Sequence, residues 1–112
     1  MRIAIPLTGG TMSLHFGHCE EFALMDVDEQ AKQVLGITRL QPPGHEPGAL
    51  PRWLAEQKAN VIIAGGMGQR AQQLFAQNGI DVVLGASAHT PEELTHTYLL
   101  GTLETGENIC DH

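Results

Sequence analysis

Two histidines and one of the two cysteines of this 112-residue chain lie within five positions, in the stretch SLHFGHCEEF. His15 and His18 are three residues apart, and Cys19 follows directly. Imidazole and thiolate groups are borderline-to-soft ligands that suit iron, zinc, copper and iron–sulfur species. The stretch is therefore a candidate metal-binding segment.

The end of the chain, in the sequence CDH, adds a second thiol and a further imidazole. This spacing is less specific than paired C-x2-C motifs, because neighbouring residues of an extended strand point to opposite sides. A surface loop with solvated histidines and a semi-buried cysteine explains the same residues, and so does a disulfide, although thiols stay reduced in the cytoplasm. The candidate ligands are His15, His18, Cys19, Cys110 and His112.

Composition narrows the class of protein. The formal net charge is −7, with only six lysines and arginines, which excludes nucleic acid and anionic membranes as partners because both need a basic surface. No apolar run approaches the roughly 20 residues of a membrane span, and the N-terminus lacks the pattern of a signal peptide. We expect a single domain over residues 1–112, located in the cytoplasm.

The elements that must position these residues follow from apolar patterning and turn residues. The order is strand, strand, strand, helix, strand, helix, strand, helix, and a hairpin is favoured over a helix for the second and third elements. We predict an α/β fold with a mixed five-stranded sheet in the order 3-2-1-4-5 and helices on its faces. The strands are expected at residues 2–7, 21–28, 33–40, 60–66 and 80–86, and two of the helices at 69–77 and 91–100.

In this order the first and fourth strands are neighbours, and their outgoing connections diverge. Open α/β sheets bind ligands at such a switch point, outside the carboxyl ends of the strands. The connection after the first strand, residues 8–20, contains the histidines and Cys19, and the other is the glycine-rich stretch 65–69. Two unusual loops are thus predicted to meet at one edge of the sheet.

The glycines of AGGMGQR have two interpretations. Backbone N–H groups at a helix N-terminus, unshielded by side chains, form an anion site, whereas glycines also simply permit a tight turn. The segment is not a nucleotide-binding P-loop, because the Lys-Ser/Thr pair is missing. His45, His89 and His96 are interpreted as ordinary surface or capping residues.

The chain contains motifs that follow one another in this order: RIAIP, HFG, ANVIIAGGMG, NGIDVVLGA and a final helix. On these motifs it resembles the dinitrogenase iron–molybdenum cofactor biosynthesis family. That family includes NifX, NafY, the C-terminal part of NifB and small stand-alone proteins of anaerobes. The resemblance implies a ribonuclease-H-like fold and a non-enzymatic role in binding, carrying or storing a metal–sulfur cluster during cofactor assembly. It makes His15 a candidate cluster ligand, with Gly65, Gly66, Met67 and Gly68 lining the same site.

His18, Cys19 and the CDH sequence depart from the family pattern and favour iron, zinc or an iron–sulfur cluster over a molybdenum cluster. The partner would be a cofactor-assembly protein. The alternative is an interaction module that docks on an iron–sulfur carrier ATPase and holds no metal. Enzyme hypotheses are weaker: Cys19 and His18 are adjacent, which rarely gives a nucleophile and its base the required geometry, and the first strand lacks the acid of ribonuclease-H nucleases.

Overall fold

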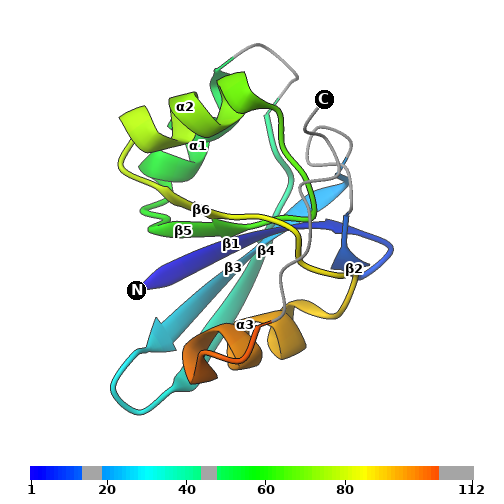
Figure 1. The fold of residues 1–112 in the computed structure, drawn as a ribbon, viewed down its shortest axis with the longest axis vertical. Helices are drawn as coiled ribbons and strands as arrows, with labels where there is room; N and C mark the ends of the chain where they lie inside the picture. The colour runs from blue at the N-terminus through cyan, green and yellow to red at the C-terminus, as the bar shows by residue number, and fades with distance from the viewer. Residues whose placement is uncertain (14–18, 44–47, 104–112) are drawn as a thin grey trace.

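The computed structural model describes residues 1–13, 19–43 and 48–103, which form one sheet with helices on both faces (Figure 1). The described residues contain the strands β1 (Arg2–Thr8), β2 (Thr11–Met12), β3 (Glu21–Asp28), β4 (Gln33–Leu40), β5 (Val61–Ile63) and β6 (Asp81–Val83), and the helices α1 (Ala49–Glu56), α2 (Gln69–Gln77) and α3 (Pro91–Leu100).

The sheet has the order β4-β3-β1-β5-β6, and β2 pairs with β1 outside this path. β3 pairs antiparallel with β1 on one side and with β4 on the other. β5 pairs parallel with β1 and with β6. The mixed α/β architecture is therefore confirmed, as are the hairpin of β3 and β4 and the adjacent, parallel placement of β1 and β5.

The number of strands was wrong, because β2 lies inside the segment predicted as a loop. Its two residues pair with Leu7 and Thr8 of β1. The turn between them is Gly9-Gly10, with φ values of 65° and 87°, a conformation that glycine adopts without strain and that suits a two-residue hairpin turn. A two-residue strand has no periodicity, so no pattern in the sequence indicated it.

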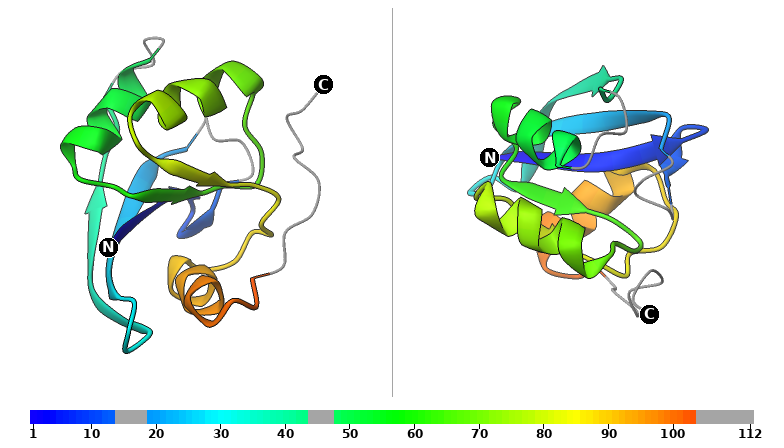
Figure 2. Two further views of the ribbon diagram at one scale, coloured as in Figure 1. Left: turned by 60° about the vertical axis from the view of Figure 1, so that its left-hand side comes forward. Right: turned by 90° about the horizontal axis from the view of Figure 1, so that it is seen from above.

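The sheet divides the apolar core into two layers, with α1 and α2 covering one face and α3 the other (Figures 1 and 2). Side chains alternate along β1 because the period of a strand is two, so Ile3 and Ile5 lie in the layer of α3 and Ala4 lies in that of α1 and α2. All three are completely buried. No described helix is long and apolar enough to span a bilayer.

Helix α3 begins and ends, and helix α2 ends, at the capping residues that the sequence predicted. Thr90 caps α3 by accepting a hydrogen bond from the N–H of Glu93 at 3.2 Å, and Pro91 occupies the first turn. Gly101 ends α3 with φ 74°, and Gly79 follows α2 with φ 76°.

An ion pair between Arg2 and Asp26 lies at the end of the sheet where β1 begins. Arg2 donates from Nε to Asp26 Oδ1 at 2.7 Å and from Nη2 to Oδ2 at 3.2 Å. Its Nη1 also donates to the carbonyl of Gln57, just after α1, at 2.7 Å. The hydrogen bonds from Arg2 lower the pKa of Asp26. The pair thus joins β1, β3 and the end of α1.

The hydroxyl of Thr95 offers a test of the core beneath α3. The residue is completely buried, and its Oγ1 has no hydrogen-bond partner among the described residues. A buried polar group without a partner costs about 1–3 kcal/mol. We therefore expect Thr95→Val to raise the free energy of unfolding by about 1 kcal/mol, measured by urea denaturation.

Thr97→Val is the matched control, because the Thr97 hydroxyl donates to the carbonyls of Glu93 and Leu94 at 3.0 and 3.1 Å. This variant loses bonds and should gain no stability. A Thr95→Val protein less stable than the wild type would show that the hydroxyl has a partner in solution.

Candidate functional site

Three connections leave the sheet at the same edge, because β1, β5 and β6 run parallel to one another. They are the segment that follows β1, the glycine-rich segment that leads from β5 to α2, and the segment that leads from β6 to α3. In Figure 1 this is the right-hand edge. The edge that the sequence predicted for a site therefore receives a third connection.

Backbone hydrogen bonds join these connections to one another. The N–H of Met12 donates to the carbonyl of His89 at 2.9 Å, which links the segment after β1 to that after β6. The N–H of Gly85 donates to the carbonyl of Gly65 at 3.0 Å, which links the segments after β5 and β6. The edge is thus a connected framework.

The glycine-rich connection is buried over Gly65, Gly66 and Met67 and becomes exposed at Gly68, where α2 begins. Gly68 is the N-cap of α2, with extended backbone and no side-chain capping bond, and the first turn contains no acidic residue. A Cβ placed on Gly68 would meet no atom within 4 Å. The first N–H groups of a helix have no partner within it, so this end offers donors and a partial positive charge to an anion.

Met67 belongs to the core in this structure. Its side chain is 1% exposed and lies in the apolar layer beneath α1 and α2. Gln72 holds this turn by donating from Nε2 to the Met67 carbonyl at 3.0 Å and from its N–H to the Gly68 carbonyl at 3.1 Å. Met67 therefore anchors the glycine-rich connection to the sheet.

Cys19 also lies in the apolar layer beneath α1 and α2. It is 9% exposed, and burial raises the pKa of its thiol to about 11. The next residue, Glu20, is fixed to the edge of the sheet: its N–H donates to the carbonyl of Leu7 and its Oε1 accepts from the N–H of Gly9, both at 2.8 Å. The free thiol is thus a buried, protonated side chain beside the carboxyl end of β1.

The other predicted ligands, His15, His18, Cys110 and His112, lie outside the described residues. The residue before the histidine segment, Ser13, donates its N–H to the carbonyl of Pro6 at 2.7 Å. Both ends of that segment, Ser13 and Cys19, are therefore at the carboxyl end of β1. Within residues 1–13, 19–43 and 48–103, no three His, Cys, Asp or Glu side chains are grouped to hold a metal ion.

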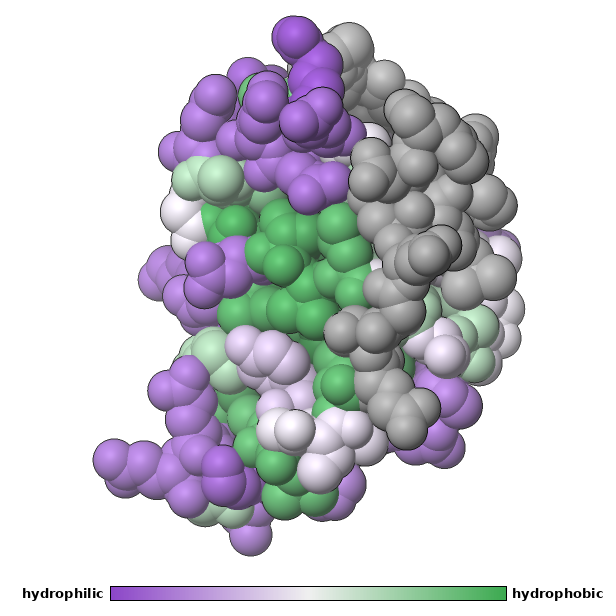
Figure 3. Space-filling view, viewed as in Figure 1, coloured by the Kyte–Doolittle hydropathy of each residue, from purple (hydrophilic) through white to green (hydrophobic). Residues whose placement is uncertain are grey.

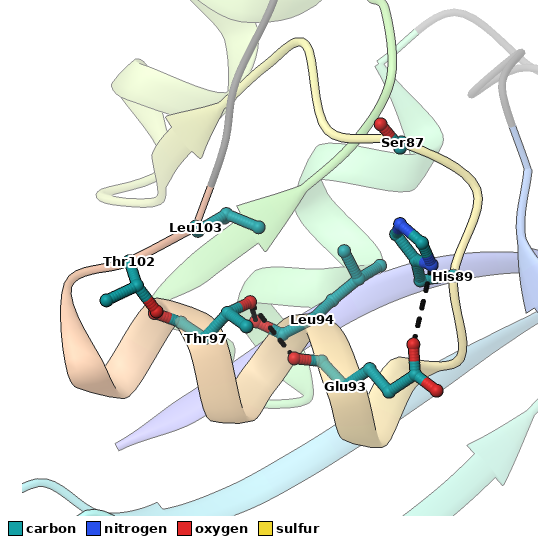
Figure 4. A pocket seen from close by; sticks show the side chains of 7 residues that line it. All are labelled: Ser87, His89, Glu93, Leu94, Thr97, Thr102 and Leu103. Atoms are coloured by element: carbon teal, nitrogen blue, oxygen red, sulfur yellow. Dashed lines mark hydrogen bonds and ion pairs between the residues drawn. The ribbon is translucent and has the colours of Figure 1, made fainter.

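A pocket of about 330 Å³ lies between α3 and the connection that leads into it (Figure 4). His89 Nδ1 and Glu93 Oε2 are 3.4 Å apart at one side of it, and the floor is apolar at Leu94 and Leu103. Both side chains of the pair are more than half exposed, which agrees with the interpretation of His89 as a surface residue. The sequence did not predict the structural role of the His89 carbonyl, which accepts the hydrogen bond from the N–H of Met12. A backbone contact of this kind leaves no pattern in the side chains.

An apolar surface adjoins this edge. Figure 3 shows it between the polar surface of α1 and α2 and that of α3. The half-buried residues Val82, Val83 and Leu84, on β6 and just after it, pack against the two core layers. The short outer strand β6 therefore leaves part of the core accessible beside the site.

Comparison with known proteins gives consistent matches over nearly the whole chain. The sequence model of the family described as "Dinitrogenase iron-molybdenum cofactor" matches residues 1–101. The "Uncharacterized protein MJ0580" of Methanocaldococcus jannaschii is 29% identical over 110 residues, which are 96% of this chain and 92% of that protein.

Among solved structures, the crystal structure of PH0822 has a TM-score of 0.85 at 28% identity and covers 94% of both chains. The apo form of the orange protein from Desulfovibrio gigas has a TM-score of 0.77 at 22% identity, covering 96% of this chain and 93% of that one, and supports the fold alone.

The burial of Cys19 generates a test. Replacing its thiol by a hydroxyl puts a more polar group into an apolar layer, so we expect Cys19→Ser to lower the free energy of unfolding of chelator-treated protein by about 1–2 kcal/mol. Cys19→Ala, which stays apolar, is the control and should cost less than the serine variant. Equal stability of Cys19→Ser and wild type in urea denaturation would contradict the buried placement.

Proposed function

Because this chain belongs to the dinitrogenase iron–molybdenum cofactor family, we propose that it binds a metal–sulfur cluster, or iron, and carries or stores it during cofactor assembly. The cluster is cargo, and the protein is not an enzyme in this proposal. We place this activity in the cytoplasm, where assembly proteins would load and unload the cargo.

The observation that carries the proposal is the edge where the connections after β1, β5 and β6 meet. The exposed start of α2 supports an anionic cargo there: no side chain caps it, no acid lies in its first turn, and space is open at Gly68. A negative charge at such a helix end gains about 0.3–1 kcal/mol, and up to about 2 kcal/mol when partly buried. This attraction is modest, so side chains that coordinate the metal are needed as well.

We propose His15 as the principal ligand, supported by the resemblance of HFG to the family motif and by the flanking residues Ser13 and Cys19 at this edge. A neutral imidazole binds iron or zinc without the cost of removing a proton from a buried group. Gly65, Gly66 and Gly68 would line the cargo through backbone groups, and the buried side chain of Met67 would hold them in place.

His18, Cys19, Cys110 and His112 are proposed as further ligands. Cys19 is the most demanding of them, because a thiol with a pKa of about 11 must lose its proton and turn out of an apolar layer. Coordination therefore has to compete with packing at this position. A cargo held at this open end of the sheet would suit transfer to a cofactor-assembly protein by exchange of its ligands.

The test is anaerobic reconstitution with ferrous iron and sulfide, followed by visible absorbance and iron analysis. We expect His15→Ala to lose most of the absorbance and bound iron while its thermal melt stays that of the wild type, because the sequence predicts a loop at this position and both described core layers form without it. His96→Ala is the matched control, since His96 is an exposed residue of α3. Wild-type iron content in the His15 variant would refute the ligand.

A wild-type protein that stays colourless and still binds an iron–sulfur carrier ATPase would refute the carrier function. It would favour the interaction module that the sequence left open.

The C-terminal ligands have a separate test. If Cys110 and His112 bind the cargo, deletion of residues 108–112 should lower the iron content or affinity and leave the melting temperature unchanged, because no described contact of the core involves them. The full-length variant with Cys110→Ala and His112→Ala is the control for chain length and should show the same loss. Unchanged iron content in both proteins would confine the ligands to the segment around His15.

A further inference from the structure

β4 is the longer of the two outer strands of the sheet, with eight residues, and it pairs only with β3. Its burial differs from that of every inner strand: Val34, Leu35 and Ile37 are 36%, 69% and 42% exposed. An outer strand presents a row of unpaired backbone N–H and C=O groups, and natural proteins usually protect such an edge with charges or proline. Here the strand has a single charged residue, Arg39, and no proline.

The end of α3 adds to the same edge. Lys32, just before β4, donates from Nζ to the carbonyl of Leu99 at 2.9 Å, which holds the last turn of α3 against the start of the strand. Leu100, the next residue, is 49% exposed. The exposed large apolar side chains among the described residues are Val34, Leu35, Ile37 and Leu100, so all of them gather along this edge.

We propose that β4 is a homodimer interface, in which it pairs antiparallel with β4 of a second copy about a two-fold axis. This inference does not rest on the metal-carrying function. In a two-fold dimer the same surface of each copy forms the interface. A single apolar strand can form such an interface when the side chains that meet across the axis are compatible.

The register supports this pairing. Ile37 pairs with Met25 and Val34 with Val27, and those two β3 residues lie in the core layer of α3, so Ile37 and Val34 face the α3 side. The ladder shifts between Asp26 and Val27, leaving Leu35 as the extra residue of a bulge.

We place the two-fold axis at Ile37 and leave out Leu35, which the bulge removes from the alternation of the strand. Residues that lie opposite each other in the two copies then point to the same face of the sheet. This axis places Ile37 opposite Ile37, Val34 opposite Arg39, and Gln33 opposite Leu40. Ile37 of one copy then meets Ile37 of the other on the α3 side, with a Val34–Arg39 pair on either side of it. Apolar side chains that lie directly opposite each other, as the two Ile37 residues do here, stabilise a strand pair.

The charge of β4 is compatible with a second copy at this edge. Two chains of net charge −7 repel each other, but β4 itself carries no acid. Arg39 Nη1 is 3.6 Å from Glu21 Oε1 and half exposed. In this register the Arg39 residues of the two copies lie on opposite sides of the axis, each opposite Val34 of the other copy, so these like charges do not face each other.

The other outer strand is a poorer candidate. β6 has three residues, and Val82 and Val83 are only half-exposed at most, despite the apolar surface that Figure 3 shows there. β4 and β6 form opposite edges of the sheet. The candidate site lies at the carboxyl ends of β1, β5 and β6, and β3 separates β4 from these strands, so a dimer through β4 needs no residue of the site.

The test is sedimentation equilibrium of the full chain over a range of concentrations. We expect the weight-average mass to rise from that of one chain toward that of two. Ile37→Lys should remain monomeric throughout, because it places two like charges directly opposite each other. Ile37→Glu should do the same, whereas an equimolar mixture of the two variants should recover the dimer, since lysine then faces glutamate.

Gln73→Lys, on the exposed surface of α2, adds the same charge elsewhere and should dimerise like the wild type. Thermal melts of each variant at dilute concentration establish that it folds. A wild-type mass of one chain at every concentration would overturn the proposal. So would an Ile37→Lys dimer as stable as that of the wild type, or a mixture of the two folded variants that stays monomeric.

Discussion

The parallel pairing of β1 with β5 is the contact on which the arrangement of this molecule depends. β1 is central: Ile3, Ile5 and Leu7 are completely buried, and helices cover both faces of the sheet. A buried strand must satisfy its backbone groups on both sides, and β1 does so through β3 on one side and β5 on the other. Because β5 runs parallel, it needs a crossover, which α1 provides.

The same pairing determines where the connections of the candidate site meet. Parallel neighbours release their outgoing connections at one edge, so the segments after β1 and β5 meet there, and β6 adds a third. The core holds these connections from below, through Cys19 and Met67 in the layer of α1 and α2. A buried anchor next to an exposed helix end is a suitable design for holding cargo, because ordered backbone donors lose little entropy on binding.

The antiparallel half of the sheet has a different character. β3 is buried nearly throughout, whereas β4 is exposed along its length, so this half ends in an apolar strand without a covering element among the described residues. The ion pair of Arg2 with Asp26 lies at the edge where β1 begins, away from the outgoing connections. The proposed ligand site and the proposed interface between copies therefore involve different strands of one sheet.

The sequence by itself determined the elements whose signals are local. The apolar run of β1, the hairpin of β3 and β4, the helix 69–77 and the Thr90-Pro91 start of α3 could all be read from periodicity and capping residues, because those depend on neighbours in the chain. The switch-point edge followed from the strand pattern, since parallel neighbours leave little choice of connection.

Only the tertiary structure decided the features that depend on distant contacts. β2 exists because two residues meet β1 after a glycine turn, and β5 and β6 are three residues long because pairing ends before their apolar runs do. The side of the chain that Cys19 faces, the Met12–His89 bond and the gathering of exposed apolar residues on β4 are likewise set by packing partners far away in sequence. From the sequence, the thiol of Cys19 beside two histidines can be interpreted as a metal ligand or as a core residue. Only its neighbours in three dimensions show that it is packed in an apolar layer.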